Sequence, residues 1–250
     1  MPADENLMPI EKLSIIIPVY NEGDNIKTLL DRIQRDIKTL VEINVIYDFD
    51  EDTTLPVLAK IKEQYPFTIR TMKNTYGKGA LNAIKTGLRY AEQEAMLVVM
   101  ADLSDSLEIA DEMYRKITEE GYDIVCGSRY MKGGCQKGGP KLKGFLSKIG
   151  GLSLHWLTEI PTHDISNSFK MYRKSIIDMM EIESDGGFEI GMELTVKAFA
   201  AGYKIAEIPS SWADRTTGES RFHLWKWLPK YLKWYAWTIR RCFKPQSMGR

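Results

Sequence analysis

The sequence predicts an α/β fold in which a mostly parallel central sheet carries helices on both faces. In the first half of the chain, short apolar runs alternate with segments whose apolar residues recur at helical spacing. The links between these segments are short, as expected where each strand is followed by a crossover helix. The 250 residues, of which 44% are hydrophobic and 27% charged, are sufficient for one substantial core.

The expected elements of the first half follow one another in a simple order. Strands are predicted over Leu13–Val19, Ile43–Tyr47, Phe67–Met72, Met96–Met100 and Asp123–Cys126, and helices over Asn25–Leu40, Leu55–Tyr65, Ala80–Ala91 and Ile109–Glu119. This strict alternation is the main reason to expect parallel strands.

The pattern changes after Gly127. Five glycines and four lysines between Met131 and Gly144 predict a mobile basic loop. Further on, helices are predicted over Leu146–Leu157, Gly191–Ala201 and Phe222–Phe243, and strands over Ile165–Tyr172 and Lys204–Ile208. We therefore expect a single domain over residues 1–221, followed by a basic, aromatic helical extension over residues 222–250.

Charge and cysteine content argue against several classes of protein. Lys plus Arg and Asp plus Glu number 34 each, so net charge gives no reason to expect a nucleic-acid partner. Three scattered cysteines indicate neither a disulfide framework nor a cysteine-based metal site. The polar, acidic start is unlike a signal peptide, and no apolar run approaches the ~18 residues that span a bilayer. The expected location is cytoplasmic.

Two carboxylates, Asp102 and Asp105, follow the apolar run of the fourth predicted strand. Ligands of parallel α/β sheets bind at the carboxyl ends of the strands, where carboxylates hold a metal or a nucleotide's hydroxyls. The alternative is that one of the two acids only caps the next helix.

Polar residues also follow the first predicted strand. Tyr20 could face a nucleotide base, and Glu22 could accept a hydrogen bond from a base or ribose. The alternative is that Asn21 and Glu22 only cap the following helix. No glycine-rich phosphate loop is present here, which counts against dehydrogenases and P-loop NTPases.

Four acids follow the second predicted strand, namely Asp48, Asp50, Glu51 and Asp52. Their spacing does not fit an EF-hand, because neither the glycine nor the terminal Glu stands where that loop needs it. One or two of them are expected to contact a nucleoside, while Asp52 or Thr53 starts the next helix.

Three blocks follow one another along the chain, namely Ser14–Glu22, Asn74–Ala83 and Gly127–Tyr130. In this order they resemble glycosyltransferase family 2, whose members have the GT-A fold of nucleotide-diphospho-sugar transferases. Three further blocks are Asp164–Lys170, Gly187–Glu189 with Glu193, and Asp214–Phe222. They are similar to the dolichol-phosphate mannose synthase branch, which uses polyprenyl phosphates. The resemblance covers about residues 12–224.

The resemblance implies inverting transfer of a sugar from a nucleotide diphosphate donor to a polyprenyl phosphate at the cytoplasmic face of a membrane. Because a phosphate acceptor is already anionic at neutral pH, it needs no general base. The protein must instead position two anions and neutralise the departing diphosphate. That requires a divalent metal, Mg²⁺ or Mn²⁺, on the leaving group and Arg or Lys on the acceptor phosphate.

The resemblance also assigns roles to residues. Asp102 is expected to bind metal and donor. Separately from the resemblance, we hypothesise that Asp105 supplies a second carboxylate from a shifted position. The donor is expected to contact Pro18, Tyr20, Glu22, Asp48, Asp52 and Lys78, and the acceptor phosphate Arg129, Lys143, Ser147 and Arg215. The expected catalytic residues are Asp102, Arg129 and Arg215.

The segment Met100–Ser104, which contains the expected metal ligand Asp102, departs from the family pattern. That pattern is usually Asp-Ala-Asp followed two residues later by Gln. Met100 stands in place of the first Asp, and Ser104 in place of the Gln. In the acidic segment after the second predicted strand, Tyr47 stands where the family has its leading Asp, and Phe49 stands where the family has a glycine. These departures leave the nucleotide base and the strength of metal binding open.

The tail between Arg221 and Lys244 contains seven Lys or Arg and no acid, interleaved with Trp and Tyr. One interpretation is a C-terminal helix packed on the core with its lysines in solvent. The other is an interfacial helix over residues 222–244 that docks on anionic lipid, as an enzyme acting on a polyprenyl phosphate needs. A membrane protein is a further expected partner.

Two other functions remain open. A family 2 transferase that glycosylates a hydroxyl of a surface polysaccharide or glycolipid would need a general base, for which Asp185, Glu189 and Glu193 are candidates. The altered segment Met100–Ser104 could instead mark a catalytically weak binding subunit that recruits partners to a membrane.

Overall fold

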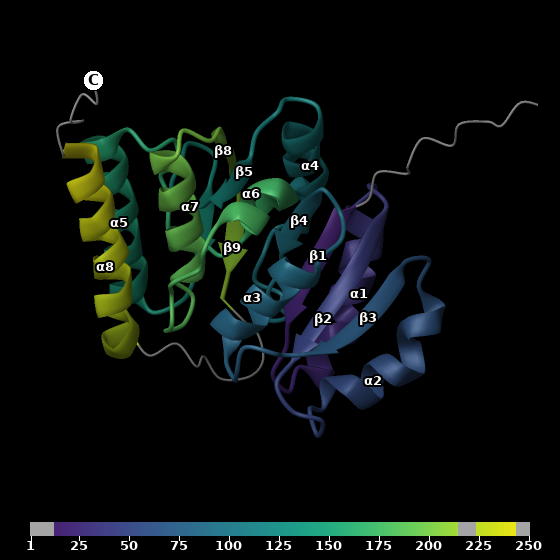
Figure 1. Ribbon diagram of the computed structural model, residues 1–250. Helices are drawn as coiled ribbons and strands as arrows, with labels where there is room; N and C mark the ends of the chain where they lie inside the picture. Colours follow the sequence, from purple (N-terminus) through teal and green to yellow (C-terminus); the bar gives the residue numbers. More distant parts are fainter. Residues whose placement is uncertain (1–12, 215–223, 244–250) are drawn as a thin grey trace, which may run out of the picture.

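The computed structural model describes residues 13–214 and 224–243 (Figure 1). Within these ranges a seven-stranded sheet has the order β3-β2-β1-β4-β7-β5-β8, with β7 antiparallel to both neighbours. Its strands are β1 (Leu13–Pro18), β2 (Val41–Tyr47), β3 (Thr68–Lys73), β4 (Ala95–Val98), β5 (Ile124–Ser128), β7 (Lys170–Arg173) and β8 (Ile205–Pro209). The predicted mostly parallel sheet is confirmed.

Helices cover both faces of this sheet, because side chains alternate along each strand. On β1, Ile15 and Ile17 pack with the helices of one face and Ile16 with those of the other. The first face carries α1 (Gly23–Asp36), α2 (Thr54–Ile61) and α4 (Ala110–Thr118), and the second carries α3 (Ala80–Tyr90), α6 (Lys174–Met179) and α7 (Ile190–Ala200). Short 3₁₀ turns follow α2 and precede α4, namely η1 (Lys62–Gln64) and η2 (Leu107–Ile109).

The region between β5 and β7 corrects two predictions. The predicted mobile loop 131–144 contains β6 (Cys135–Lys137), which pairs in parallel with β9 (Ser211–Ala213), and the first turn of α5 (Lys141–Thr158). The predicted strand Ile165–Tyr172 is a strand only from Lys170 onward. The residues before Lys170 instead form turns, in which Asn167 Nδ2 donates to the Gly127 carbonyl at 2.8 Å.

Two predicted boundaries shift for identifiable reasons. The first helix ends at Asp36 rather than Leu40, because the backbone turns extended at Ile37 and the Asp111 carboxylate captures the N–H groups of Lys38 and Thr39. Strand β4 ends at Val98 rather than Met100, whose N–H donates to the Asp105 carboxylate at 3.2 Å.

The C-terminal helix α8 (Leu224–Phe243) packs against α5 and α7 (Figure 1). Trp234 is 1% exposed, and its indole N–H donates to Ser184 Oγ at 3.0 Å. The Tyr235 hydroxyl donates to Ser153 Oγ on α5 at 2.9 Å. The interpretation of the tail as a helix packed on the core therefore holds for this side of α8.

Candidate active site

The loops after β1 and β2 are joined at the carboxyl edge of the sheet. Asn21 donates its backbone N–H to Asp52 Oδ2 at 3.0 Å, and its side-chain oxygen accepts from the Thr53 N–H at 3.1 Å. Asp52 is fully buried, and its Oδ1 accepts from the Thr54 N–H at 2.9 Å. Asp52 thus organises the start of α2. Its side chain has no exposed atom with which to make the predicted contact with the donor.

An aromatic pair borders this edge. Tyr20, which is 42% exposed, meets the Phe49 ring edge-on with the centroids 5.2 Å apart. Pro18 ends β1 just before it, and Glu22 accepts a hydrogen bond from Asn25 Nδ2 at 2.7 Å. The pair offers a nucleotide base an apolar surface beside polar backbone.

Asp48 fixes a third loop at the same edge. Its Oδ1 accepts from Asn74 Nδ2 at 2.9 Å and its Oδ2 from the Gly79 N–H at 2.8 Å. Gly79 has φ +111°, a conformation that favours glycine, and it precedes the first turn of α3. This arrangement places exposed Lys78 on a loop anchored by Asp48, at the edge where the donor is expected.

The loop after β4 carries the predicted metal ligands. Asp102 Oδ1 accepts from the Ser104 hydroxyl at 2.6 Å and from the Ser104 N–H at 3.2 Å. Asp105 is 6% exposed. Its burial, reinforced by the negative charge of Asp102, raises the pKa of Asp105 to about 7. Two carboxylates therefore lie close enough to repel each other, which is the situation that a bound divalent cation relieves.

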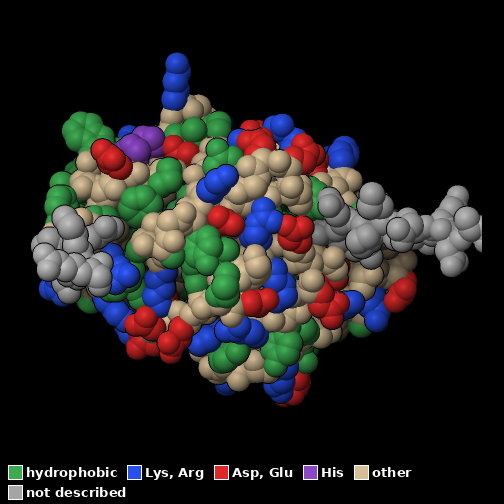
Figure 2. Space-filling model, turned by 45° about the horizontal axis from the view of Figure 1, so that its top comes forward, with side chains coloured by type: hydrophobic (Ala, Val, Ile, Leu, Met, Phe, Trp, Pro, Cys, Tyr) green, Lys and Arg blue, Asp and Glu red, His purple; other side chains and the backbone are tan. Residues whose placement is uncertain are grey.

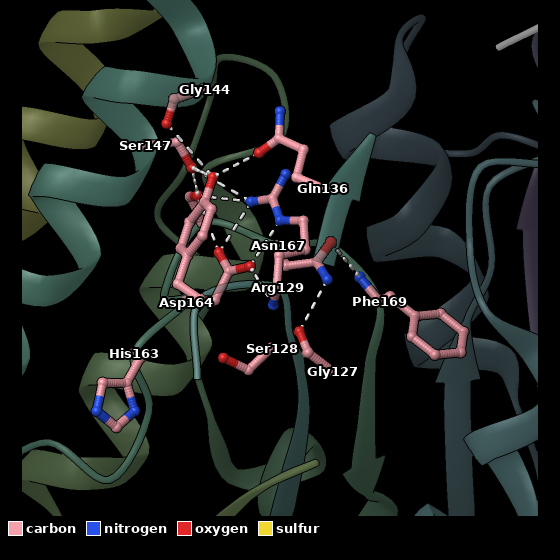
Figure 3. A network of polar contacts seen from close by, with 12 residues as sticks. Gly127, Ser128, Arg129, Gln136, Gly144, Ser147, His163, Asp164, Asn167 and Phe169 are labelled. Carbon is pink, nitrogen blue, oxygen red and sulfur yellow. Dashed lines mark hydrogen bonds and ion pairs between the residues drawn. The ribbon is translucent and has the colours of Figure 1, made fainter. Parts of the chain in front are cut away.

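Arg129 lies at the end of β5 in a dense polar network, shown in Figure 3. Its Nε donates to Asp164 Oδ2 at 2.6 Å and its Nη2 to Asp164 Oδ1 at 2.9 Å. Burial of the guanidinium disfavours its charge, but the Asp164 carboxylate outweighs this, so the pKa of Arg129 lies above its ordinary value. Arg129 is held charged and in one orientation.

The hydroxyls of Ser147 and Ser166 complete this network. Arg129 Nη2 lies 3.2 Å from Ser147 Oγ and 3.3 Å from Ser166 Oγ, and the two serine oxygens are 2.5 Å apart. The Tyr130 hydroxyl donates to Ser147 Oγ at 3.0 Å and lies equally far from Gln136 Oε1. The structure thus brings together two of the predicted acceptor ligands, Arg129 and Ser147.

The other predicted acceptor ligands are Lys143 and Arg215. Lys143 lies on α5 one turn before Ser147, so both occupy the same side of that helix. Arg215 lies outside the described residues. The resembling blocks contain Tyr130, Asp164 and Ser166, but the sequence did not show that they form one network with Arg129.

Donor-side and acceptor-side groups share one edge of the sheet. Because β7 is antiparallel to both β4 and β5, the latter two point the same way, and their carboxyl ends meet at that edge. The Arg129 charge also acts on Asp105, whose pKa it lowers against the larger effect of burial. Two anionic substrates could therefore be held side by side here.

The candidate general bases are engaged elsewhere. Glu189 is fully buried, and its two oxygens accept from the N–H groups of Gly186 and Gly187 at 2.8 and 2.6 Å. Glu193 is also fully buried and accepts from the Glu183 and Ser184 N–H groups at 2.6 and 2.8 Å. Asp185 is exposed and ion-paired with Lys230. Glu189 and Glu193 thus organise the loop before α7 and the start of that helix.

Comparison with known proteins decides the family. Residues 14–180 match the model of Glycosyl transferase family 2. The chain belongs to glycosyltransferase family 2. It is 30% identical over 249 residues to the dolichol-phosphate mannosyltransferase of Pyrococcus furiosus, covering 95% of this chain and 68% of that protein. It is 24% identical over 217 residues to the polyprenol monophosphomannose synthase of Mycolicibacterium smegmatis, covering 85% of this chain and 82% of that protein.

Solved structures confirm the GT-A fold of this glycosyltransferase. Glucosyl-3-phosphoglycerate synthase from Mycobacterium tuberculosis, in complex with Mn²⁺, UDP and glucosyl-3-phosphoglycerate, superposes with a TM-score of 0.64 at 15% identity, covering 95% of this chain and 82% of that one. The same enzyme with Mg²⁺ and UDP superposes with a TM-score of 0.63. At this identity the likeness shows the fold.

The residues present fit a divalent cation that is held jointly with the donor. Asp102 and Asp105 supply hard carboxylate oxygens and repel each other. Across the described residues, no group of three or more His, Cys, Asp or Glu is arranged to hold a metal. Mg²⁺ and Mn²⁺ in phosphate-transfer sites commonly use one or two carboxylates plus substrate phosphates, and Asp102 with Asp105 matches that number of carboxylates.

Proposed function

We propose that this family 2 glycosyltransferase moves a sugar from a nucleotide diphosphate to a polyprenyl phosphate, with inversion at the anomeric carbon. The main support is the Arg129–Ser147 network, which brings a charged guanidinium and a hydroxyl together at the carboxyl edge, while the candidate bases Glu189 and Glu193 are fully buried. A phosphate acceptor needs a positioned cation and no base, whereas a hydroxyl acceptor needs a base. The names of the two curated relatives support the same acceptor class.

In the proposed reaction, an ionised oxygen of the acceptor phosphate forms a bond to the anomeric carbon. The bond from that carbon to the donor diphosphate breaks, and the nucleoside diphosphate leaves with the electron pair. Arg129, with the hydroxyls of Ser147 and Ser166, would hold the acceptor phosphate in line. A divalent metal bound with Asp102 would supply charge neutralisation on the leaving diphosphate.

The test uses the purified full chain with Mn²⁺, a panel of UDP- and GDP-sugars and a short polyprenyl phosphate. We expect one donor to yield a polyprenyl-phosphate sugar, identified by mass spectrometry. A polysaccharide or glycolipid hydroxyl offered in parallel should not be glycosylated. Transfer to the hydroxyl and not to the lipid phosphate would contradict the proposal, and so would the absence of turnover with every donor.

We also propose that α5 and α8 rest on an anionic membrane surface, which revises the predicted docking through residues 222–244 alone. The 18 residues of α5 and the 20 of α8 contain eight Lys or Arg and no Asp or Glu. Their most exposed large apolar side chains are Leu142, Phe145, Ile149, Trp156, Leu157, Trp225, Leu232 and Phe243. On α5 they recur at spacings of three, four and seven, which places most of them in one stripe.

This surface, here called the α5–α8 face, lies at one end of the molecule (Figure 1), where Figure 2 also shows hydrophobic side chains. Trp156 is 84% and Trp225 74% exposed, and such rings suit the headgroup layer of a bilayer. None of the described helices combines the length and apolar character that a bilayer-spanning helix requires. Lysines and arginines without carboxylates favour anionic lipid over a second copy of the chain.

Vesicle co-sedimentation tests this surface. We expect the chain to bind vesicles containing phosphatidylglycerol more tightly than vesicles of phosphatidylcholine. The variant F145S/I149S/W156S should lose most of this binding. The matched control L40S/Y90S/M179S, which removes exposed apolar side chains from other elements, should retain it. Unchanged binding of the α5 variant, or a stable dimer that the same variant dissociates, would overturn the proposed lipid contact.

A further inference from the structure

The loop that carries Asp102 and Asp105 is gripped by a side chain from a helix far away in the sequence. Arg32, in the third turn of α1, donates from Nη1 to the Leu103 carbonyl at 2.8 Å and from Nη2 to the Asp105 carbonyl at 2.7 Å. One planar guanidinium thus spans the backbone on either side of Ser104. Such a fork, with two fixed N–H directions, is a contact that a lysine cannot reproduce.

The gripped backbone is in a conformation that it would not adopt readily alone. Leu103 has φ +64°, in the left-handed region that branched and bulky residues disfavour. Strained residues of this kind persist when surrounding contacts over-determine them, and they concentrate at functional sites. The two Arg32 hydrogen bonds are such contacts.

The opposite side of the loop is held by β9. The Ala213 N–H donates to the Ser104 carbonyl at 3.1 Å, and Asp105 forms an isolated antiparallel bridge with Trp212. The Ser106 hydroxyl donates to the Ser211 carbonyl at 2.7 Å. Contacts from α1 and β9 therefore hold the loop on two sides, an arrangement here called the clamp. Arg32 provides the contacts from α1.

We infer that Arg32 is a positioning residue for metal and donor diphosphate, acting through the backbone that carries Asp102 and Asp105. This inference rests on the proposed function, in which these carboxylates hold the cation. A metal site that takes only one or two protein ligands depends on those ligands being pre-placed. Met100, which replaces a carboxylate of the family pattern, makes the remaining ligands more dependent on the clamp.

The first test measures Mn²⁺ binding by the electron paramagnetic resonance signal of free Mn²⁺, with whichever of GDP and UDP binds the wild-type chain. We expect R32M, and R32K to a lesser degree, to weaken Mn²⁺–nucleotide binding by about tenfold. In turnover assays the donor KM should rise while the KM for polyprenyl phosphate stays unchanged. R35M is the matched control, because Arg35 lies on the same helix, is exposed and pairs with Asp36.

A second variant separates positioning from a merely structural role. Glycine adopts φ +64° without steric cost, so L103G should recover part of the Mn²⁺–nucleotide affinity when combined with R32M. Thermal unfolding of each variant checks that the chain is folded. If R32M is unfolded, the Mn²⁺–nucleotide affinity of R32K is compared with that of the wild type instead. Equal Mn²⁺–nucleotide affinity of wild type and a folded Arg32 variant would overturn the inference. Absence of binding by the wild type would instead contradict the proposed function.

Discussion

Single side chains at the carboxyl edge have distinct tasks that their sequence context only partly reveals. Asp52 and Asp48 both follow β2, yet Asp52 is buried under backbone donors while Asp48 anchors the loop of Lys78. The acidic run therefore predicted polar side chains at the carboxyl edge and left the role of each acid undecided. The role of Arg129 was also only partly predictable. Its ion pair with Asp164 joins residues 35 positions apart, and no local sequence pattern encodes such a contact.

Replacing Asp102 tests the metal side of the site. D102N keeps the shape and the contact with Ser104 but removes the negative charge. Because neutralisation of a leaving diphosphate is worth several kcal/mol, kcat should fall by about 100-fold or more. Initial rates over a Mn²⁺ titration measure this, with D178N as the control because Asp178 lies on α6, is exposed and pairs with Lys174. A D102N rate within twofold of wild type would contradict a metal role.

Replacing Ser147 tests the acceptor side. S147A removes a hydroxyl that touches Arg129, Ser166 and Tyr130, without emptying a large volume. Loss of one hydrogen bond to a phosphate should raise the acceptor KM by about threefold to tenfold. The donor KM should not change, and steady-state kinetics with each substrate varied in turn measure both. An effect confined to the donor KM would remove Ser147 from the acceptor side.

Among the elements, strongly periodic ones were predictable and short paired ones were not. The strands β1, β2 and β5 are buried apolar runs whose type follows from their own residues. The three-residue strand β6 exists because it pairs with β9 some 75 residues later, whereas the glycine- and lysine-rich segment around it predicts a loop. The turn before β7 has the apolar content of a strand, yet its polar side chains bond to β5 and Arg129.

The helix α8 contributes to stability through one side and leaves the other to solvent or lipid. W234A should destabilise the chain by about 3–5 kcal/mol, because it empties a fully enclosed site and removes the partner of Ser184. W225A, at a position 74% exposed, should change the free energy of unfolding by less than about 0.5 kcal/mol. Urea unfolding of both variants measures the difference. Similar values for the two would mean that α8 does not share the core.

At the scale of the whole molecule, the fold has a buried carboxylate, Glu42, that contributes to the loss of stability at low pH. Glu42 on β2 is 4% exposed and accepts from Ser14 Oγ at 2.5 Å and Gln93 Nε2 at 3.2 Å, with Arg70 nearby at 3.4 Å. Burial alone would raise its pKa, but these donors and the cation outweigh burial and lower the pKa in the folded state. The ionised form therefore stabilises the fold.

The stability of the fold depends on pH through Glu42, because the pKa of this carboxyl is lower in the folded state than in the unfolded chain. The contribution of Glu42 is present above pH about 4.5, the ordinary pKa of a glutamate, and is lost as the pH falls through its lower folded value. E42Q should flatten this acid limb by up to about 1.4 kcal/mol per pH unit. Urea midpoints between pH 3 and 6, about the range over which a Glu titrates, measure this, and an unchanged acid limb would contradict the assignment.

The short β6–β9 ribbon has a consequence for how the two substrates affect each other's binding. Strand β9 bonds to the loop of Asp102 and Asp105, and β6 carries Gln136, which bonds to Tyr130 beside Arg129. We expect a ligand that stiffens one end of this ribbon to change the free energy of binding at the other, and such coupling is reciprocal. Nucleotide should then change the affinity for lipid phosphate by the same factor by which lipid phosphate changes that for nucleotide.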